Sequence, residues 1–124
     1  DVRDLSRYSA ADSAVFAPLT EAQRLDSVMT FSRPYPEIVV TPEVRQEGFE
    51  SFVTTDDHLM HLTGLAKDQN GTKYYVTKNS WGTDRNGFGG YLNMSESFVR
   101  AKTIYVMLHK DALPAALRKR LGIR

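Results

Sequence analysis

The chain contains no cysteine among its 124 residues. It therefore forms no internal disulfide, and it cannot by itself supply a nucleophilic thiolate. Long apolar runs are also missing: none approaches the roughly 18 residues that a membrane-spanning helix needs, and no signal peptide is visible. The net charge of +1 gives no electrostatic reason to expect nucleic acid or a membrane surface as a partner.

What the chain does contain is ordinary for a globular protein. Hydrophobic residues make up 41% and charged residues 25% of the sequence. A chain of this length corresponds to one domain or to part of one.

Capping signals predict several helices. Residues 20–23 read Thr-Glu-Ala-Gln, a capping box that opens a helix over 21–29. Thr41 is a helix cap followed by proline and an acidic residue, which predicts a helix from Pro42 to Phe49 or Phe52. Shorter signals predict a helical turn over 95–101 and a last helix from 111 to 121, with Gly122 as its cap.

β-Branched and aromatic residues predict strands in the middle of the chain. The runs 59–65 and 72–77 flank a turn-forming segment at 67–71 and form a hairpin. A short strand over 91–94 follows. Residues 103–109 (TIYVMLH) are apolar on both faces and predict a buried strand.

The length of the hairpin loop decides which residues meet. A two-residue turn at 70–71 would place His58 opposite Thr83, whereas a five-residue loop at 67–71 would bring His58 beside Asn79. The longer loop pairs Ala66 with Thr72 and Leu59 with Asn79. We favour it because hairpin loops of four or five residues are common.

The motifs around this hairpin are specific. They are Asp57-His58-Leu59-Met60, Leu62-Thr63-Gly64, Lys78-Asn79-Ser80-Trp81-Gly82 and Gly89-Gly90-Tyr91-Leu92-Asn93-Met94. With this pattern the chain resembles the papain-like cysteine peptidases, and it is most similar to the bleomycin hydrolase and aminopeptidase C branch. The resemblance covers about 41–122 and is strongest over 56–94.

The resemblance implies a fold and a set of roles. The fold class is α+β: the C-terminal part of a papain-like fold, an antiparallel sheet or half-barrel with flanking helices. His58 is the implied catalytic base, Asn79 its orienting group and Trp81 a shield over their contact, while Asp57 supports the imidazolium electrostatically. In this family the histidine follows the nucleophilic cysteine by roughly 130–150 residues. We therefore expect 1–124 to be the His- and Asn-bearing portion of the domain, with the Cys-bearing portion absent.

The implied function is that of a cysteine-type aminopeptidase that removes N-terminal residues from peptides. Its partners would be peptide substrates, the Cys-bearing remainder of the enzyme and, by resemblance, further copies of itself in a hexamer. The resemblance implies a cytoplasmic location, with a periplasmic or secreted one left open, and no cofactor. The alternative is a non-catalytic papain-like homologue that acts as a binding or scaffolding module.

Two other functions that the residues invite are a metal site and a phosphate-binding loop. His58 and His61 form an H-x-x-H pair, but strand residues three apart point to opposite faces and cannot chelate one ion, so we expect no metal site. The glycine-rich segment 82–90 lacks the Lys-Ser/Thr of a phosphate-binding loop. We expect it to be a tight turn behind Trp81.

The first prediction is that the purified 124-residue chain has no peptidase activity, because none of its residues replaces a thiolate. The measurement is hydrolysis of an aminoacyl-coumarin substrate. Turnover that is inhibited by a thiol alkylator would contradict it.

Overall fold

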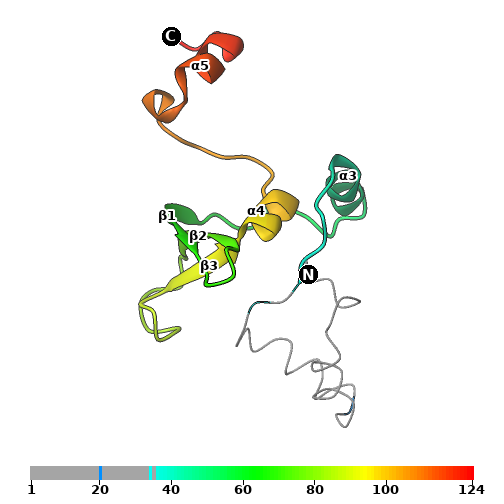
Figure 1. The fold of residues 1–124 in the computed structure, drawn as a ribbon, viewed down its shortest axis with the longest axis vertical. Helices are drawn as coiled ribbons and strands as arrows, with labels where there is room; N and C mark the ends of the chain where they lie inside the picture. The colour runs from blue at the N-terminus through cyan, green and yellow to red at the C-terminus, as the bar shows by residue number, and fades with distance from the viewer. Residues whose placement is uncertain (1–19, 21–33, 35) are drawn as a thin grey trace.

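The computed structural model describes Thr20, Pro34 and residues 36–124. The predicted helix over 21–29 lies outside the described residues. One antiparallel sheet with helices beside it forms the described part, which confirms the predicted α+β class (Figure 1). The elements are α3 (Pro42–Glu50), β1 (His61–Lys67), β2 (Lys73–Lys78), β3 (Tyr91–Ser95), α4 (Glu96–Lys102), the 3₁₀ helix η2 (Lys110–Ala112) and α5 (Ala115–Leu121).

Helix α3 begins where its capping residues predict. The Thr41 hydroxyl accepts a hydrogen bond from the Val44 N–H at 3.3 Å, and Pro42 occupies the first position. The hydrogen bond with the Thr41 side chain, followed by that with its own N–H, lowers the pKa of Glu43. A carboxylate in the first turn also complements the helix dipole.

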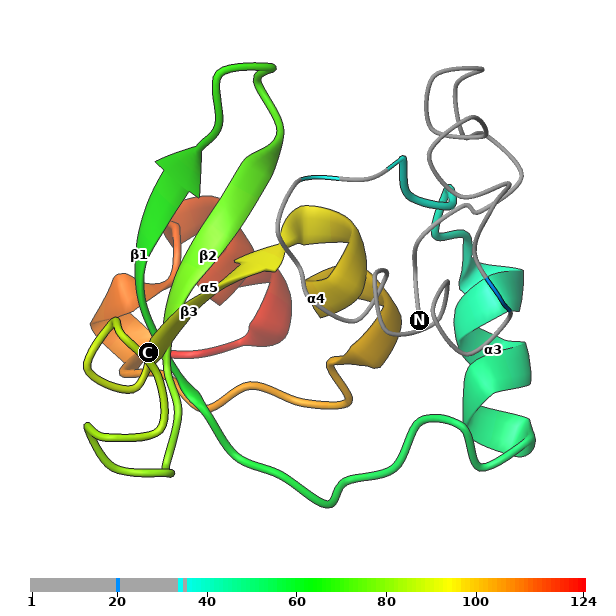
Figure 2. The same ribbon diagram turned by 90° about the horizontal axis from the view of Figure 1, so that it is seen from below.

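The sheet is a meander in the order β1-β2-β3, and α4 continues directly from its last strand. Ser95 ends β3 and caps α4, because its hydroxyl accepts from the Phe98 N–H at 3.1 Å. Helix α4 contacts β2, β3 and α3, so it joins the sheet to the first described helix (Figure 2).

Residues 68–72 separate β1 from β2, so the hairpin loop has the predicted five residues but begins one residue later than predicted. The Asp68 N–H donates to the Thr72 carbonyl at 3.0 Å, and the Gly71 N–H donates to the Asp68 carbonyl at 3.1 Å. Gly71 has a φ of 86°, as the end of such a turn requires. The Asp68 carboxylate accepts from the N–H groups of Asn70 and Thr72 at 2.8 and 2.9 Å. This side chain selects the turn.

The register therefore differs from the predicted one. Ala66 lies opposite Tyr74, and the predicted pairing of Ala66 with Thr72 is wrong. A bulge between Leu62 and Gly64 then shifts the pairing by one residue, toward the predicted alignment. The segment that precedes β1 consequently still reaches the end of β2.

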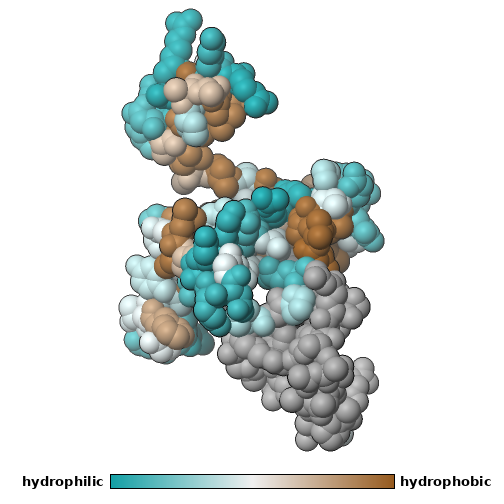
Figure 3. Space-filling view, viewed as in Figure 1, coloured by the Kyte–Doolittle hydropathy of each residue, from teal (hydrophilic) through white to brown (hydrophobic). Residues whose placement is uncertain are grey.

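Few side chains are buried in the described part of the chain. Met94 is its buried apolar residue, and the buried polar residues are Thr77, Asn79 and Ser95. Apolar side chains are exposed over several separate elements, including the C-terminal helix (Figure 3). The sheet centre is thus small and partly polar.

The predicted buried strand over 103–109 is wrong. This segment is an extended connection without strand pairing, and its apolar side chains are exposed, with Met107 at 97%. A strand needs a neighbour to satisfy its backbone groups, and no strand lies beside 103–109 among the described residues. Intrinsic strand propensity alone is therefore not sufficient for a segment to join the sheet.

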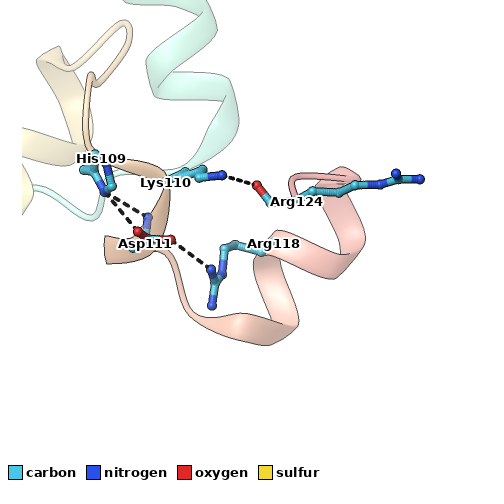
Figure 4. A network of polar contacts seen from close by, with 5 residues as sticks. All are labelled: His109, Lys110, Asp111, Arg118 and Arg124. Carbon is cyan, nitrogen blue, oxygen red and sulfur yellow. Dashed lines mark hydrogen bonds and ion pairs between the residues drawn. The ribbon is translucent and has the colours of Figure 1, made fainter.

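The C-terminal helix is displaced from the sheet in Figure 1 and is held by polar contacts with η2. The Arg118 guanidinium donates to the Asp111 carboxylate at 3.2 Å, and the Lys110 ammonium donates to the Arg124 carbonyl at 2.6 Å (Figure 4). Helix α5 begins at Ala115, later than the predicted residue 111, because the residues before the proline form η2 instead. Gly122 ends α5 in the left-handed region, as predicted. None of the described helices is long and apolar enough to cross a membrane.

The hairpin loop generates a stability prediction. Desolvation raises the pKa of Asp68, but hydrogen bonds from Thr72 and Asn70 outweigh it, so the pKa lies below the ordinary value. Such a carboxylate stabilises the fold above its unfolded-state pKa of about 3.9, and this stabilisation is lost as the pH falls below that value. We expect Asp68→Ala to lower the thermal unfolding midpoint by about 4 °C at pH 7.

The difference between Asp68→Ala and the unaltered chain should narrow as the pH falls from 5 toward 3. Asp56→Ala is the matched control, since the Asp56 carboxylate has no partner in the described part of the chain. An equal loss in both variants at pH 7 would contradict a specific role for Asp68.

Candidate active site

Asn79 lies at the end of β2 and is fixed there by its backbone and its side chain. Its side chain is 5% exposed, and its N–H donates to the Gly90 carbonyl at 3.0 Å. Its side-chain oxygen Oδ1 accepts from the Ser80 N–H at 2.8 Å. Because a backbone N–H can only donate, this contact assigns the oxygen and nitrogen of the Asn79 amide.

His58 lies in the segment before β1, and its side chain contacts the Asn79 oxygen. Its Nε2 lies 2.7 Å from Asn79 Oδ1. An amide oxygen can only accept, so Nε2 carries a proton and donates it to this contact. In the neutral imidazole the other nitrogen, Nδ1, is then unprotonated and available as a base. The contact thus selects both the orientation and the tautomer of His58.

Trp81 lies beside the imidazole. The two ring centroids are 6.2 Å apart, with 28° between the ring planes, so the rings are stacked. The indole is nevertheless 61% exposed, and His58 is also exposed. In the described residues, Trp81 therefore covers one side of the imidazole and leaves the rest open to solvent. Its predicted shielding role stays a prediction.

Asp57 of the predicted site and His61 of the H-x-x-H pair make no hydrogen bond or ion pair with the imidazole in the described residues. The Asp57 carboxylate accepts from the Thr55 hydroxyl at 2.9 Å, and no contact among residues 36–124 joins it to His58. Its electrostatic role stays a prediction. His61 is exposed in β1 opposite Lys78. Over the described ranges, no group of three or more metal-type ligands occurs.

The residues that support Asn79 were not predicted from the sequence. Ser80 contributes the N–H that fixes the amide, and Gly90 contributes the carbonyl that holds the backbone. Asn86 organises the loop between them, since its Oδ1 accepts from the N–H groups of Phe88 and Gly90 at 3.1 and 2.9 Å. An asparagine inside a glycine-rich segment was the available signal, because its side chain readily bonds nearby backbone groups.

The arrangement has a definite chemical capacity. An oriented, exposed imidazole with a free Nδ1 can accept a proton from a nucleophile and return it to a leaving group. Its Nε2–H would stay bonded to Asn79 throughout, which stabilises the charged form. The chain has no cysteine of its own to be the nucleophile.

Comparisons with known proteins identify a family and relatives of this chain. A model of the Peptidase C1-like family matches residues 43–122. Aminopeptidase C from Lactobacillus helveticus is 39% identical over 64 residues, which are 51% of this chain and 14% of that protein. Fruit bromelain from Ananas comosus is 40% identical over 42 residues, which are 34% of this chain and 12% of that protein. The chain therefore spans only a small part of either relative.

The stacking of Trp81 on His58 generates a spectroscopic prediction. Trp81 is the chain's only tryptophan, and an excited indole is quenched by a protonated imidazole in contact with it. We expect Trp81 emission to be weaker in acid than at neutral pH, because a protonated His58 imidazole quenches it. His58→Ala should abolish this change and His61→Ala should retain it. A pH-dependent change that survives in His58→Ala would contradict the stacked geometry.

Proposed function

We propose, since this chain belongs to the Peptidase C1-like family, that it carries the general base of a cysteine peptidase and the group that orients it. His58 is the base and Asn79 is the orienting residue. The observation that carries the proposal is the 2.7 Å contact between His58 Nε2 and Asn79 Oδ1, which leaves Nδ1 unprotonated. The nucleophilic thiol comes from a cysteine outside this chain.

The proposed mechanism begins with a proton transfer. The thiol gives its proton to His58 Nδ1, and the thiolate attacks the carbonyl carbon of the substrate. The imidazolium then donates that proton to the leaving amine, which breaks the peptide bond and leaves an acyl-enzyme. Water attacks the acyl group while His58 accepts its proton, the C–S bond breaks to release the acid product, and the imidazolium returns the proton to the thiolate sulfur.

Asn79 contributes orientation rather than a proton. With its oxygen fixed by the Ser80 N–H, it holds the imidazole plane while Nδ1 gains and loses a proton. A neutral oxygen acceptor also stabilises the imidazolium through a charge-assisted hydrogen bond. This supports the assignment of the base to His58 rather than to His61, which lies opposite Lys78 in β1 and has no such acceptor among the described residues.

We further propose that the reaction removes N-terminal residues from peptides. The supporting observation is the extent of the matches, 64 residues with aminopeptidase C against 42 with fruit bromelain. Assembly with the Cys-bearing part is in keeping with the small apolar centre of the described residues. The implied hexamer and the cytoplasmic location stay predictions.

Substitutions in the complete enzyme test the catalytic assignment. We expect His58→Ala to lower kcat by at least about 10³-fold, since general base catalysis contributes that order. Asn79→Ala should retain some activity and lose about 10²-fold, because a misplaced base still functions. His61→Ala is the matched control and should affect mainly thermal stability. Equal losses of kcat from both histidine substitutions would contradict the assignment.

The same preparations distinguish a cysteine peptidase from a non-catalytic binding module. They also test whether the enzyme is an aminopeptidase. Absence of a cysteine at the position facing His58 Nδ1, together with no turnover by the unaltered protein, would favour a non-catalytic binding module. Cleavage of N-acetylated peptides as fast as of free peptides would contradict an aminopeptidase.

A further inference from the structure

Lys78, the last residue of β2, contacts the far end of the glycine-rich loop. Its half-buried side chain extends to the loop over 82–90, and its ammonium donates to the Gly89 carbonyl at 2.5 Å. The same ammonium lies 4.9 Å from the centroid of the Tyr91 ring. Lys78 and Tyr91 are direct partners across the β2–β3 ladder, so a cation–π contact and a charge-assisted hydrogen bond converge on one group.

The loop over 82–90 is closed on itself at this point. Gly82 and Gly90 both have positive φ, at 81° and 80°. A Cβ built on Gly90 would overlap the Gly82 carbonyl and lie 2.7 Å from Lys78 Nζ. The two ends of the loop therefore touch, and the ammonium lies at their junction, where backbone carbonyls gather.

Trp81 immediately precedes the loop, and packing alone does not hold it. Its side chain is 61% exposed, although its ring stacks on His58. A largely exposed indole keeps one position only if the backbone on both sides of it is fixed. On one side the bond between Ser80 and Asn79 fixes the backbone, and on the other side the closed loop does so.

We propose that Lys78 is a positioning residue that holds Trp81 against the His58–Asn79 pair by closing the loop over 82–90. It acts through the backbone and touches neither the imidazole nor the substrate. The catalytic consequence rests on the proposed function, whereas the effect on the position of Trp81 does not.

A second lysine in the same strand provides a matched control. Lys73 begins β2, its side chain is 66% exposed, and its contact in the described residues is a 3.9 Å ion pair with Glu96. Replacing Lys73 removes the same charge from the same strand without touching the loop. Lys78→Arg is the conservative variant, because it keeps both the donor and the positive charge.

The experiment measures Trp81 fluorescence in Lys78→Met, Lys78→Arg and Lys73→Met, with circular dichroism to verify folding. We expect Lys78→Met to lose at least half of the pH-dependent quenching by His58 and to become more accessible to acrylamide. Lys73→Met should match the unaltered chain, and Lys78→Arg should restore most of the quenching. Unchanged quenching in folded Lys78→Met, or an equal loss in Lys73→Met, would overturn the proposal.

If Lys78→Met does not fold, Tyr91→Leu replaces it. This variant keeps the bond to Gly89 and removes the ring beside the ammonium, so quenching should fall by a smaller fraction. Unchanged quenching there would overturn the proposal.

Kinetics of the complete enzyme separate positioning from general stability. Lys78→Met and Trp81→Leu should each lower kcat/KM about tenfold, and the double variant should lose no more than the larger single loss. Multiplicative losses would overturn the proposal, since they would mean that the two residues act independently. An inactive unaltered enzyme would count against the proposed function, and the fluorescence result would still decide the role of Lys78.

Discussion

The carboxamide oxygen of Asn79 is the constraint on which the site depends. It accepts from the Ser80 N–H and from His58 Nε2, and these two bonds determine the amide orientation and the imidazole tautomer together. The oxygen of this buried residue can serve two donors only if its strand end cannot move. The bond from the Asn79 N–H to the Gly90 carbonyl provides that restraint. The pairing of β2 with β3 therefore bears directly on the chemistry of the imidazole.

The sequence predicts local structure well where a single side chain decides it. Thr41 caps α3, Ser95 lies at the predicted start of α4, and Gly122 ends α5, because each acts on backbone groups within its own turn. The predicted register of the hairpin is wrong for an equally specific reason. The Asp68 carboxylate bonds two N–H groups of its own loop and selects a turn that composition alone does not single out. The bulge between Leu62 and Gly64 then shifts the pairing of the two strands back by one residue, toward the predicted register. The contact between His58 and Asn79 was therefore predictable although the register of the hairpin was wrong.

The segment over 103–109 shows what strand propensity can and cannot predict. Its β-branched and aromatic residues favour extended backbone, and the backbone is indeed extended. A buried strand further requires a neighbouring strand and a covering layer, which depend on residues remote in sequence. Neither is present for this segment in the part of the chain that the structure describes. The same limit applies to Lys78, whose partners Gly89 and Tyr91 are defined only once the loop has closed.

Exposure of the site has a consequence for the proposed chemistry. A thiolate and an imidazolium attract each other strongly only where water is excluded, because bulk solvent and salt screen the pair. His58 is exposed and Trp81 covers one side of it, so the described residues orient the base without desolvating it. The surface that brings the thiol must then also enclose the imidazole. In the proposed mechanism, orientation and desolvation of the base are therefore divided between the two sides of the site: this chain supplies the first, and the surface that carries the thiol supplies the second.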